Sequence, residues 1–194
     1  NIDLMSLSAH KIHGPKGIGA LYIKKGTKID SLIHGGGQEL NKRAGTENVA
    51  MIVGFTKALE LSLREDKKSI LKLRNKLIDG ILNNIPESYL NGDKEKRLYN
   101  NVNISFHYVE GEAILLLLNK EGVAASSGSA CTSKSLEPSH VLLALGVDYD
   151  LAHSSTRFTL SEYTTEEEID FIIDLMPKII KRLREISSLK RKEE

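Results

Sequence analysis

The sequence has few of the features that mark secreted or membrane proteins. It contains one cysteine, Cys131, so no disulfide can form within the chain. Such a lone cysteine is either a small buried side chain or a reactive thiol. No apolar run approaches the ~20 residues that a membrane-spanning helix needs, and the first residues do not have the pattern of a signal peptide. We therefore expect a cytoplasmic protein without a membrane partner.

The sequence also lacks an excess of charge and a metal-binding pattern. Lys and Arg number 27 against 26 Asp and Glu, for a net charge of +1. This balance gives no reason to expect nucleic acid as a partner. His10 and His13 lie close together, but no acidic residue or cysteine stands at a familiar ligand spacing from them, so no metal site is expected. Hydrophobic residues make up 40% and charged residues 27%, which is typical of a globular protein with a real core.

The first part of the chain predicts two strands and a long helical region. Residues 4–9 are suited to a buried strand, and residues 18–24 alternate like a second strand after a glycine-containing turn. Thr46 is suited to be the N-cap of a helical region that continues, with or without a break, to about Asn84 and ends before Pro86. Because Asn1 falls at the start of a strand pattern, we interpret the chain as a fragment of a longer protein.

The pattern changes near Pro86 to that of a compact α+β domain. Strands are predicted over residues 100–106, 123–125 and 156–160, and a helix over residues 112–119. A second helix is predicted to have Pro138 in its first turn and to end at Gly146. We therefore place a domain boundary between residues 86 and 87.

The last helix has the clearest local signals. Thr165 and Glu168 form a capping box at its start. Apolar residues then recur at helical spacing and predict one buried face, with a kink at Pro177. The members of this face are Ile169, Ile172, Ile173, Met176, Ile179, Ile180 and Leu183.

Lys11 is the first candidate for chemistry. It stands at the end of the predicted strand 4–9, beside small residues and a glycine turn, where burial would make the amine a nucleophile toward an aldehyde. Ser8 and His10 can donate hydrogen bonds to an anion, and the glycines allow a ligand to approach the backbone. An exposed lysine before a plain turn is the ordinary alternative. A nucleotide-binding P-loop is excluded, because the lysine precedes the glycines.

Cys131 and Arg157 are the other two candidates. Residues 126–136 are small and mostly polar, so they predict an exposed loop, and Cys131 within it is either a reactive thiol or an accidental surface cysteine. Arg157 interrupts a strand pattern. Its guanidinium is able to bind a carboxylate through two hydrogen bonds, and the alternative is an edge-strand arginine that faces water.

Several segments together carry a family resemblance. They are residues 8–17 (SAHKIHGPKG), 34–39 (HGGGQE), 43–49 (RAGTENV), 126–133 (SSGSACTS), 136–139 (LEPS), Arg157 and residues 163–170 (YTTEEEID). In this order they resemble the cysteine desulfurases of the NifS/IscS class, which belong to the class-V aminotransferase family of fold type I pyridoxal 5′-phosphate (PLP) enzymes. The resemblance extends over nearly the whole chain.

The resemblance implies an α/β fold that is the C-terminal part of a fold type I PLP-dependent transferase. Residues 1–86 would be the remnant of the large PLP-binding domain with a bridging helix. Residues 87–194 would be the small α+β domain that carries the cysteine loop.

The resemblance also implies roles for residues of the first part. Lys11 would form the aldimine with PLP and later move protons, while Ser8 and His10 would bind the phosphate of the cofactor. Thr46 matches a position that reaches the phosphate of the neighbouring subunit's cofactor, so the resemblance implies a homodimer.

In the second part, the resemblance implies that Arg157 binds the carboxylate of L-cysteine. Cys131 would take the substrate sulfur as a persulfide and release L-alanine. The long form of the cysteine loop implies that the sulfur goes to an iron–sulfur scaffold or another acceptor protein.

The chain departs from the family in its length. Family enzymes carry a preceding part that supplies a histidine against the PLP ring and an aspartate for its nitrogen, so we expect the fragment alone to be inactive. Two alternatives remain open from the sequence. One is a non-enzymatic sulfur-relay or partner-binding domain, and the other is a related PLP enzyme such as a selenocysteine lyase.

Overall fold

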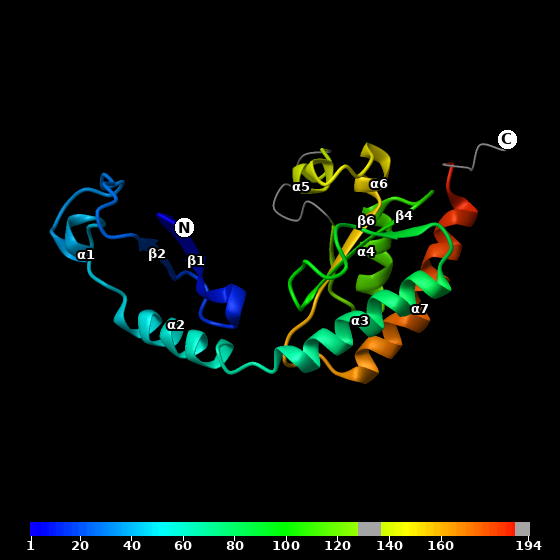
Figure 1. The fold of residues 1–194 in the computed structure, drawn as a ribbon, viewed down its shortest axis with the longest axis horizontal. Coiled ribbons are helices and arrows are strands. Elements are labelled where there is room, and N and C mark those ends of the chain that lie inside the picture. Colours follow the sequence, from blue (N-terminus) through cyan, green and yellow to red (C-terminus); the bar gives the residue numbers. More distant parts are fainter. Residues whose placement is uncertain (128–136, 189–194) are drawn as a thin grey trace. The chain divides into compact units, whose positions relative to one another are not determined.

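The computed structural model describes residues 1–127 and 137–188 (Figure 1). Contacts divide the chain into two compact units, Asn1–Glu65 and Asp66–Glu194. The predicted helical region up to about Asn84 is confirmed as two helices, of which the second lies in the second unit. The boundary between residues 86 and 87 stays a prediction about the domains of a longer protein.

The first unit contains an antiparallel strand pair and a helix (Figure 1). β1 (Leu4–Ser8) pairs with β2 (Gly19–Ile23), with Leu4 opposite Ile23 and Ser8 opposite Gly19. A 3-10 helix, η1 (Ala9–Ile12), follows β1 directly. The remaining elements are a short irregular turn, α1 (Gln38–Asn41), and the longest helix of the unit, α2 (Val49–Ser62).

The expectation that β1 is buried is wrong for this chain. Every residue of β1 except Leu7 is exposed. Within the described residues β1 pairs with β2 alone, and a two-stranded pair without an apolar layer on either face cannot bury its side chains. The buried apolar side chains of this unit are the alanines Ala9, Ala44 and Ala58.

The start of α2 also differs from the prediction. Asn48, rather than Thr46, is the N-cap, and its Oδ1 accepts a hydrogen bond from the Met51 N–H at 3.3 Å. Asparagine caps a helix at least as well as threonine, so the later residue takes this place. Thr46 therefore lies outside the helix, in the exposed segment that precedes it.

The second unit is built on a four-stranded antiparallel sheet in the order β3-β4-β6-β5. Its strands are β3 (Ser88–Leu90), β4 (Asn101–Phe106), β5 (Ser126–Ser127) and β6 (Ser155–Thr159). The predictions for β4 and β6 are confirmed. The strand expected over residues 123–125 is wrong by a few residues, because pairing with β6 begins at Ser126. β3 was not predicted.

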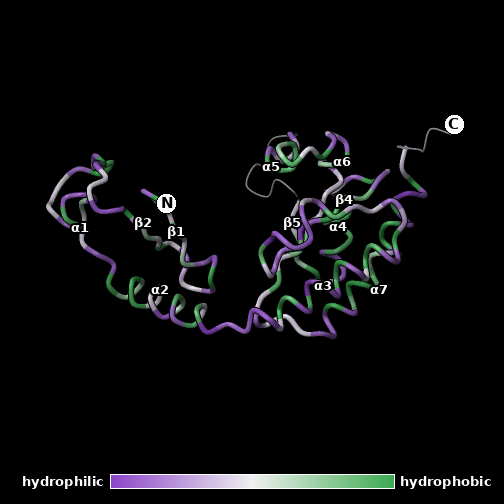
Figure 2. The backbone as a smooth tube through the Cα atoms, viewed as in Figure 1, coloured by the Kyte–Doolittle hydropathy of each residue, from purple (hydrophilic) through white to green (hydrophobic). Residues whose placement is uncertain are grey.

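Three helices cover one face of this sheet (Figure 1). They are α3 (Lys67–Asn84), α4 (Gly111–Lys120) and α7 (Glu166–Ile186). The side chains of Val102, Ile104 and Phe106 on β4 alternate onto this face and are fully buried, as the period of two in a strand requires. Figure 2 shows apolar and polar residues alternating along α3 and α7, as expected for helices with one buried face.

The last helix, α7, confirms the capping box. The Glu168 N–H donates to Thr165 Oγ1 at 3.3 Å, and the Thr165 N–H donates to Glu168 Oε2 at 2.9 Å. The predicted inner face is buried except for Ile173, which is half-buried. The helix continues through Pro177 to Ile186.

Two short helices, α5 (His140–Ala144) and α6 (Tyr149–His153), precede β6 in the chain. The N-cap of α5 is Ser139, so the placement of Pro138 within the first turn is wrong by two residues. The prediction for Gly146 is confirmed, because it follows the C-cap with a positive φ of 80°, a conformation that glycine adopts without strain.

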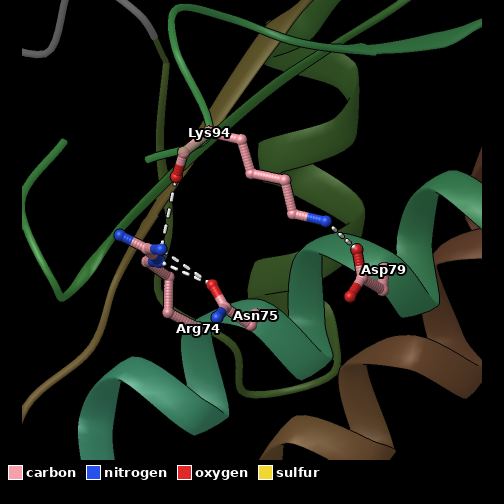
Figure 3. A network of polar contacts seen from close by, with 4 residues as sticks. All are labelled: Arg74, Asn75, Asp79 and Lys94. Carbon is pink, nitrogen blue, oxygen red and sulfur yellow. Dashed lines mark hydrogen bonds and ion pairs between the residues drawn. The ribbon is translucent and has the colours of Figure 1, made fainter. Parts of the chain in front are cut away.

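Two arginines, Arg74 and Arg97, organise the segment between β3 and β4, and Figure 3 shows the first of them. Arg74 on α3 is 3% exposed and donates to the carbonyl oxygens of Leu98 at 3.1 Å and Lys94 at 3.3 Å. Arg97 donates through Nε to the Asp93 carbonyl at 2.7 Å and through Nη2 to the Asn91 carbonyl. A buried guanidinium must satisfy its donors, so these contacts hold the segment in place and fix the position of Asn91.

Candidate active site

The residues at the end of β1 combine one anchor with three available side chains. Ala9 is fully buried, its N–H donates to the Ile18 carbonyl at 3.2 Å, and its carbonyl accepts from the Gly14 N–H at 2.9 Å. Ser8, His10 and Lys11 around it are exposed. The backbone of this turn is therefore fixed, while the three functional side chains are free to contact a ligand.

Gly14 closes this turn against α2. A Cβ on Gly14 would lie 2.9 Å from the Ala9 carbonyl oxygen and 3.1 Å from the Ala58 Cβ. Both distances are closer than ordinary van der Waals contact, so only glycine lets the turn and the helix approach this closely. Gly14 thus supports the Lys11 segment by allowing the turn to pack against α2.

Lys11 itself is exposed, contrary to the burial expected from the sequence. The reason is the one that exposes β1, namely that no apolar layer of the described residues covers this strand pair. Lys11 makes no ion pair with a described residue. Ser8 is the N-cap residue of η1, but its hydroxyl makes no capping hydrogen bond.

Thr46 lies in the same unit as Lys11, in the segment between α1 and α2. It is exposed and follows Gly45, whose φ is 103° and whose N–H donates to Gln38 Oε1 at 3.1 Å. The glycine gives the chain a left-handed turn just before Thr46, so the turn leaves the threonine hydroxyl outside any helix.

Arg157 lies in the second unit, at the centre of β6. It stands opposite Asn103 on β4 and opposite Ser126 on β5. The alternative of an edge-strand arginine is therefore wrong, because β6 has a neighbour on both sides. Its Nε is buried and has no hydrogen-bond partner in the part of the chain that the structure describes. A buried charged donor without an acceptor is costly and marks a place where a ligand can supply one.

A row of polar residues crosses the sheet at Arg157. It consists of Asn91, Asn103, Arg157 and Ser126, one from each strand or its immediate end, and we refer to it as the polar row. The Asn91 N–H donates to the Asn103 carbonyl at 2.9 Å, and Asn103, Arg157 and Ser126 are direct cross-strand partners. Since cross-strand partners point to the same side of a sheet, the row lies on the face opposite the apolar core.

Side-chain hydrogen bonds order the first half of the polar row. Asn91 Nδ2 donates to Asn103 Oδ1 at 2.6 Å and to Ser105 Oγ at 2.8 Å. All three residues are buried. We did not predict this cluster, although β4 carried a signal for it, since Asn101, Asn103 and Ser105 alternate with the apolar residues of the same strand.

Cys131 lies outside the described residues, as does most of the loop predicted over residues 126–136. Ser126 and Ser127, the first residues of that loop, form β5 instead. β5 therefore ends beside β6, with Ser126 opposite Arg157 and Ser127 opposite Thr156.

Among residues 1–127 and 137–188, no group of three or more His, Cys, Asp or Glu side chains is arranged to hold a metal ion. None of the described helices is long and apolar enough to cross a membrane.

Comparison with known proteins identifies the family. The family model Aminotransferase class-V matches residues 1–172. The chain belongs to the class-V aminotransferase family. It is 54% identical over 196 residues to the cysteine desulfurase IscS of Methanosarcina thermophila, a match that covers 100% of this chain and 48% of that protein.

Solved structures of this family have the same fold. A NifS-like protein matches with a TM-score of 0.83 at 39% identity, over 94% of this chain and 47% of its own. SspA in complex with cysteine matches with a TM-score of 0.62 at 34% identity, over 85% of this chain and 46% of its own. The chain thus has the fold of a type I PLP enzyme. It spans about half the length of the relatives that it matches.

Members of this class-V aminotransferase group use PLP, and the residues at the end of β1 fit that cofactor. PLP requires an amine for its aldehyde and hydrogen-bond donors for its phosphate. The segment offers the amine of Lys11, the hydroxyl of Ser8 and the imidazole of His10, all exposed on a fixed turn. The predicted site residues therefore fall into two groups, one in each unit.

Proposed function

We propose that the protein containing this chain is a PLP-dependent cysteine desulfurase. It converts L-cysteine to L-alanine and carries the sulfur away as a persulfide on Cys131. The observation that supports this proposal most directly is the buried Arg157 Nε, which has no acceptor within residues 1–127 and 137–188. The relatives of the chain include a cysteine desulfurase and a protein with bound cysteine.

Four residues of the first unit would hold the cofactor. Lys11 binds it covalently through its amine and later moves a proton with that same nitrogen, while Ser8 and His10 donate hydrogen bonds to its phosphate. Thr46 donates to the phosphate of the neighbouring subunit's cofactor, so the enzyme acts as a homodimer. When bound, PLP supplies the electron sink that weakens bonds at the substrate's α and β carbons.

Arg157 binds the substrate carboxylate. Its guanidinium is always charged and presents donors in a fixed fork that matches a carboxylate. The neighbouring strands support this role, because the cross-strand partners of Arg157 are the neutral residues Asn103 and Ser126, neither of which carries a carboxylate.

Cys131 accepts the sulfur. Its thiolate attacks the sulfur of bound L-cysteine, a sulfur–sulfur bond forms as the carbon–sulfur bond breaks, and a proton replaces sulfur on the carbon that becomes alanine. A thiolate is needed because the thiol is a poor nucleophile. The persulfide then passes to an iron–sulfur scaffold or another acceptor protein in the cytoplasm.

The test uses the full-length protein that contains this chain. After exposure to L-cysteine, wild-type protein should carry a persulfide on the peptide containing Cys131, and Cys131→Ser should carry none while keeping its PLP absorbance. Lys11→Ala should lose that absorbance, whereas Lys25→Ala, at another exposed lysine of the same unit, should keep it. Normal sulfur transfer by Cys131→Ser would refute the assignment of Cys131.

The role of Arg157 is tested separately. Arg157→Ala should raise the KM for L-cysteine, because it removes a charge-assisted contact that contributes about 2–4 kcal/mol. An unchanged KM would show that another residue binds the carboxylate.

A further inference from the structure

The polar row raises the question of why Arg157 Nε has no acceptor among the described residues, although an asparagine stands opposite. Asn103 stands directly opposite Arg157, and an asparagine amide has an oxygen that can accept and a nitrogen that can only donate. With the oxygen toward Arg157, the Nε–H of the guanidinium would have an acceptor inside the protein. The Arg157 Nε nevertheless has no acceptor among the described residues.

Asn91 determines the orientation of the Asn103 amide. Asn91 Nδ2 donates one hydrogen to Asn103 Oδ1 at 2.6 Å and the other to Ser105 Oγ at 2.8 Å. The Asn103 oxygen is therefore turned toward β3. Because the two atoms of the amide leave the same carbon in different directions, we infer that its nitrogen faces away from Asn91, toward β6, the other neighbour of β4.

Asn91 is itself fixed by its backbone and by burial. Its N–H donates to the Asn103 carbonyl at 2.9 Å, and its carbonyl accepts from Arg97 Nη2. Asn91 is only 6% exposed. Loss of either hydrogen bond would therefore leave a buried N–H group without an acceptor, which is costly.

We propose that Asn91 and Asn103 are positioning residues that keep Arg157 free for a carboxylate ligand. By presenting a donor rather than an acceptor to Arg157, Asn103 prevents an internal hydrogen bond that would compete with the substrate. Asn91 holds Asn103 in this orientation. The inference rests on the proposed role of Arg157, and it attributes the availability of Arg157 for a carboxylate to these two neighbours.

The first test is Asn91→Asp in the full-length enzyme at a pH where the new carboxylate is ionised. An ionised carboxylate only accepts hydrogen bonds, so the Asn103 amide must rotate and turn its oxygen toward Arg157. The KM for L-cysteine should rise by about tenfold while kcat changes little, as expected for loss of one hydrogen bond to a charged group. Inhibition by cysteamine, which lacks the carboxylate, should be unchanged.

The second test compares two substitutions of Asn103. Asn103→Asp places a carboxylate opposite Arg157 and should raise the KM further, by about a hundredfold, because it forms an internal charge-assisted pair. Asn103→Leu removes the amide but creates no acceptor, so its KM should rise much less. A purely structural role predicts the reverse order of KM values, because Leu cannot satisfy the donors of Asn91.

Asn83→Asp is the matched control, since it makes the same change at an exposed position of α3 and should leave the KM unchanged. Thermal unfolding of each variant checks that it is folded. If Arg157→Ala raises the KM but Asn103→Asp and Asn91→Asp do not, the inference is wrong and the proposed function stands. If Arg157→Ala leaves the KM unchanged, the proposed role of Arg157 is wrong as well.

Discussion

Thr156 and Arg157 are adjacent on β6 and present unpaired polar atoms to opposite faces of the sheet. Arg157 belongs to the polar row, whereas Thr156 is fully buried opposite Ile104 of the apolar core. Thr156 Oγ1 has no hydrogen-bond partner within the described residues. Burial of the Thr156 hydroxyl therefore lowers the free energy of unfolding, and a ligand on the polar face cannot compensate for this loss.

Replacing this hydroxyl should stabilise the second unit. Thr156→Val keeps the shape of the side chain and removes an unpaired buried donor, so the free energy of unfolding should rise by about 1 kcal/mol. Urea unfolding followed by circular dichroism measures this change. Thr159→Val, at an exposed position on the same strand, should change the stability little, and a destabilised Thr156→Val would contradict the interpretation.

At the scale of elements, Gly111 sets how closely α4 approaches the start of β6. A Cβ at this position would lie 2.5 Å from the His153 carbonyl oxygen and 3.3 Å from that of Ser155. Gly111→Ala should destabilise the unit by about 1–3 kcal/mol, because strain against a backbone exceeds the ~1 kcal/mol gain in helix propensity. Equilibrium unfolding measures the loss, with Glu112→Ala at the exposed next position of α4 as the control. An increase in stability would show that α4 moves freely.

An ion-pair cluster links α3 to α7. Lys76 Nζ lies 2.6 Å from Asp170 Oδ1 and 2.6 Å from Glu166 Oε1. Hydrogen bonds to these carboxylates, with Asp170 making the larger contribution and Glu166 the smaller, raise the pKa of Lys76 above its ordinary value of 10.5. Since the charged amine is favoured in the folded state, its contribution is complete below the unfolded pKa and is lost as the pH rises through the folded pKa.

Lys76→Met should remove this alkaline part of the pH dependence. The wild-type protein should lose stability more steeply than Lys76→Met as the pH rises above about 10. Urea unfolding at a series of pH values measures the two slopes. Lys72→Met, at an exposed position of the same helix, should keep the wild-type slope, and equal slopes for all three proteins would exclude the effect.

The elements that were predicted well from the sequence are those whose own residues carry the pattern of a helix or a strand. α7 combines a capping box with a complete apolar face, and β4 alternates polar and apolar residues over its whole length. β3 has three residues and β5 has two, so they exist because β4 and β6 pair with them. The same reason explains why the position of Arg157 on an inner strand and its row with Asn91 could not be predicted from local patterns.

At the scale of the whole molecule, the two units differ in how much apolar surface they bury. The large apolar core runs from Ile70 to Leu183 and lies entirely within the second unit. In the first unit Val49 and Val53 on α2, and Leu63 at its C-cap, are more than half exposed. Because local stability follows burial, the two units should open with different free energies.

Hydrogen exchange of the 194-residue chain tests this difference. Backbone amides of β4 and α7 should exchange slowly, at rates set by unfolding of the second unit, while those of β1, β2 and α2 should exchange much faster. Mass spectrometry of peptic fragments resolves these segments. Equal protection of α2 and α7 would show that the first unit is stabilised by contacts such as self-association.

Asn91 is followed by Gly92, and this pair is open to a slow chemical change. Glycine has no Cβ, so its backbone nitrogen easily attacks the preceding side-chain amide. Ammonia leaves, a cyclic imide forms, and water then opens this ring to aspartate or isoaspartate. Burial and two hydrogen bonds at Asn91 Nδ2 slow that attack. Where deamidation does occur, its aspartate product is the same side chain as in Asn91→Asp, and peptide mapping of aged protein would detect it. An old molecule would thus acquire a negative charge in the polar row before it lost its fold.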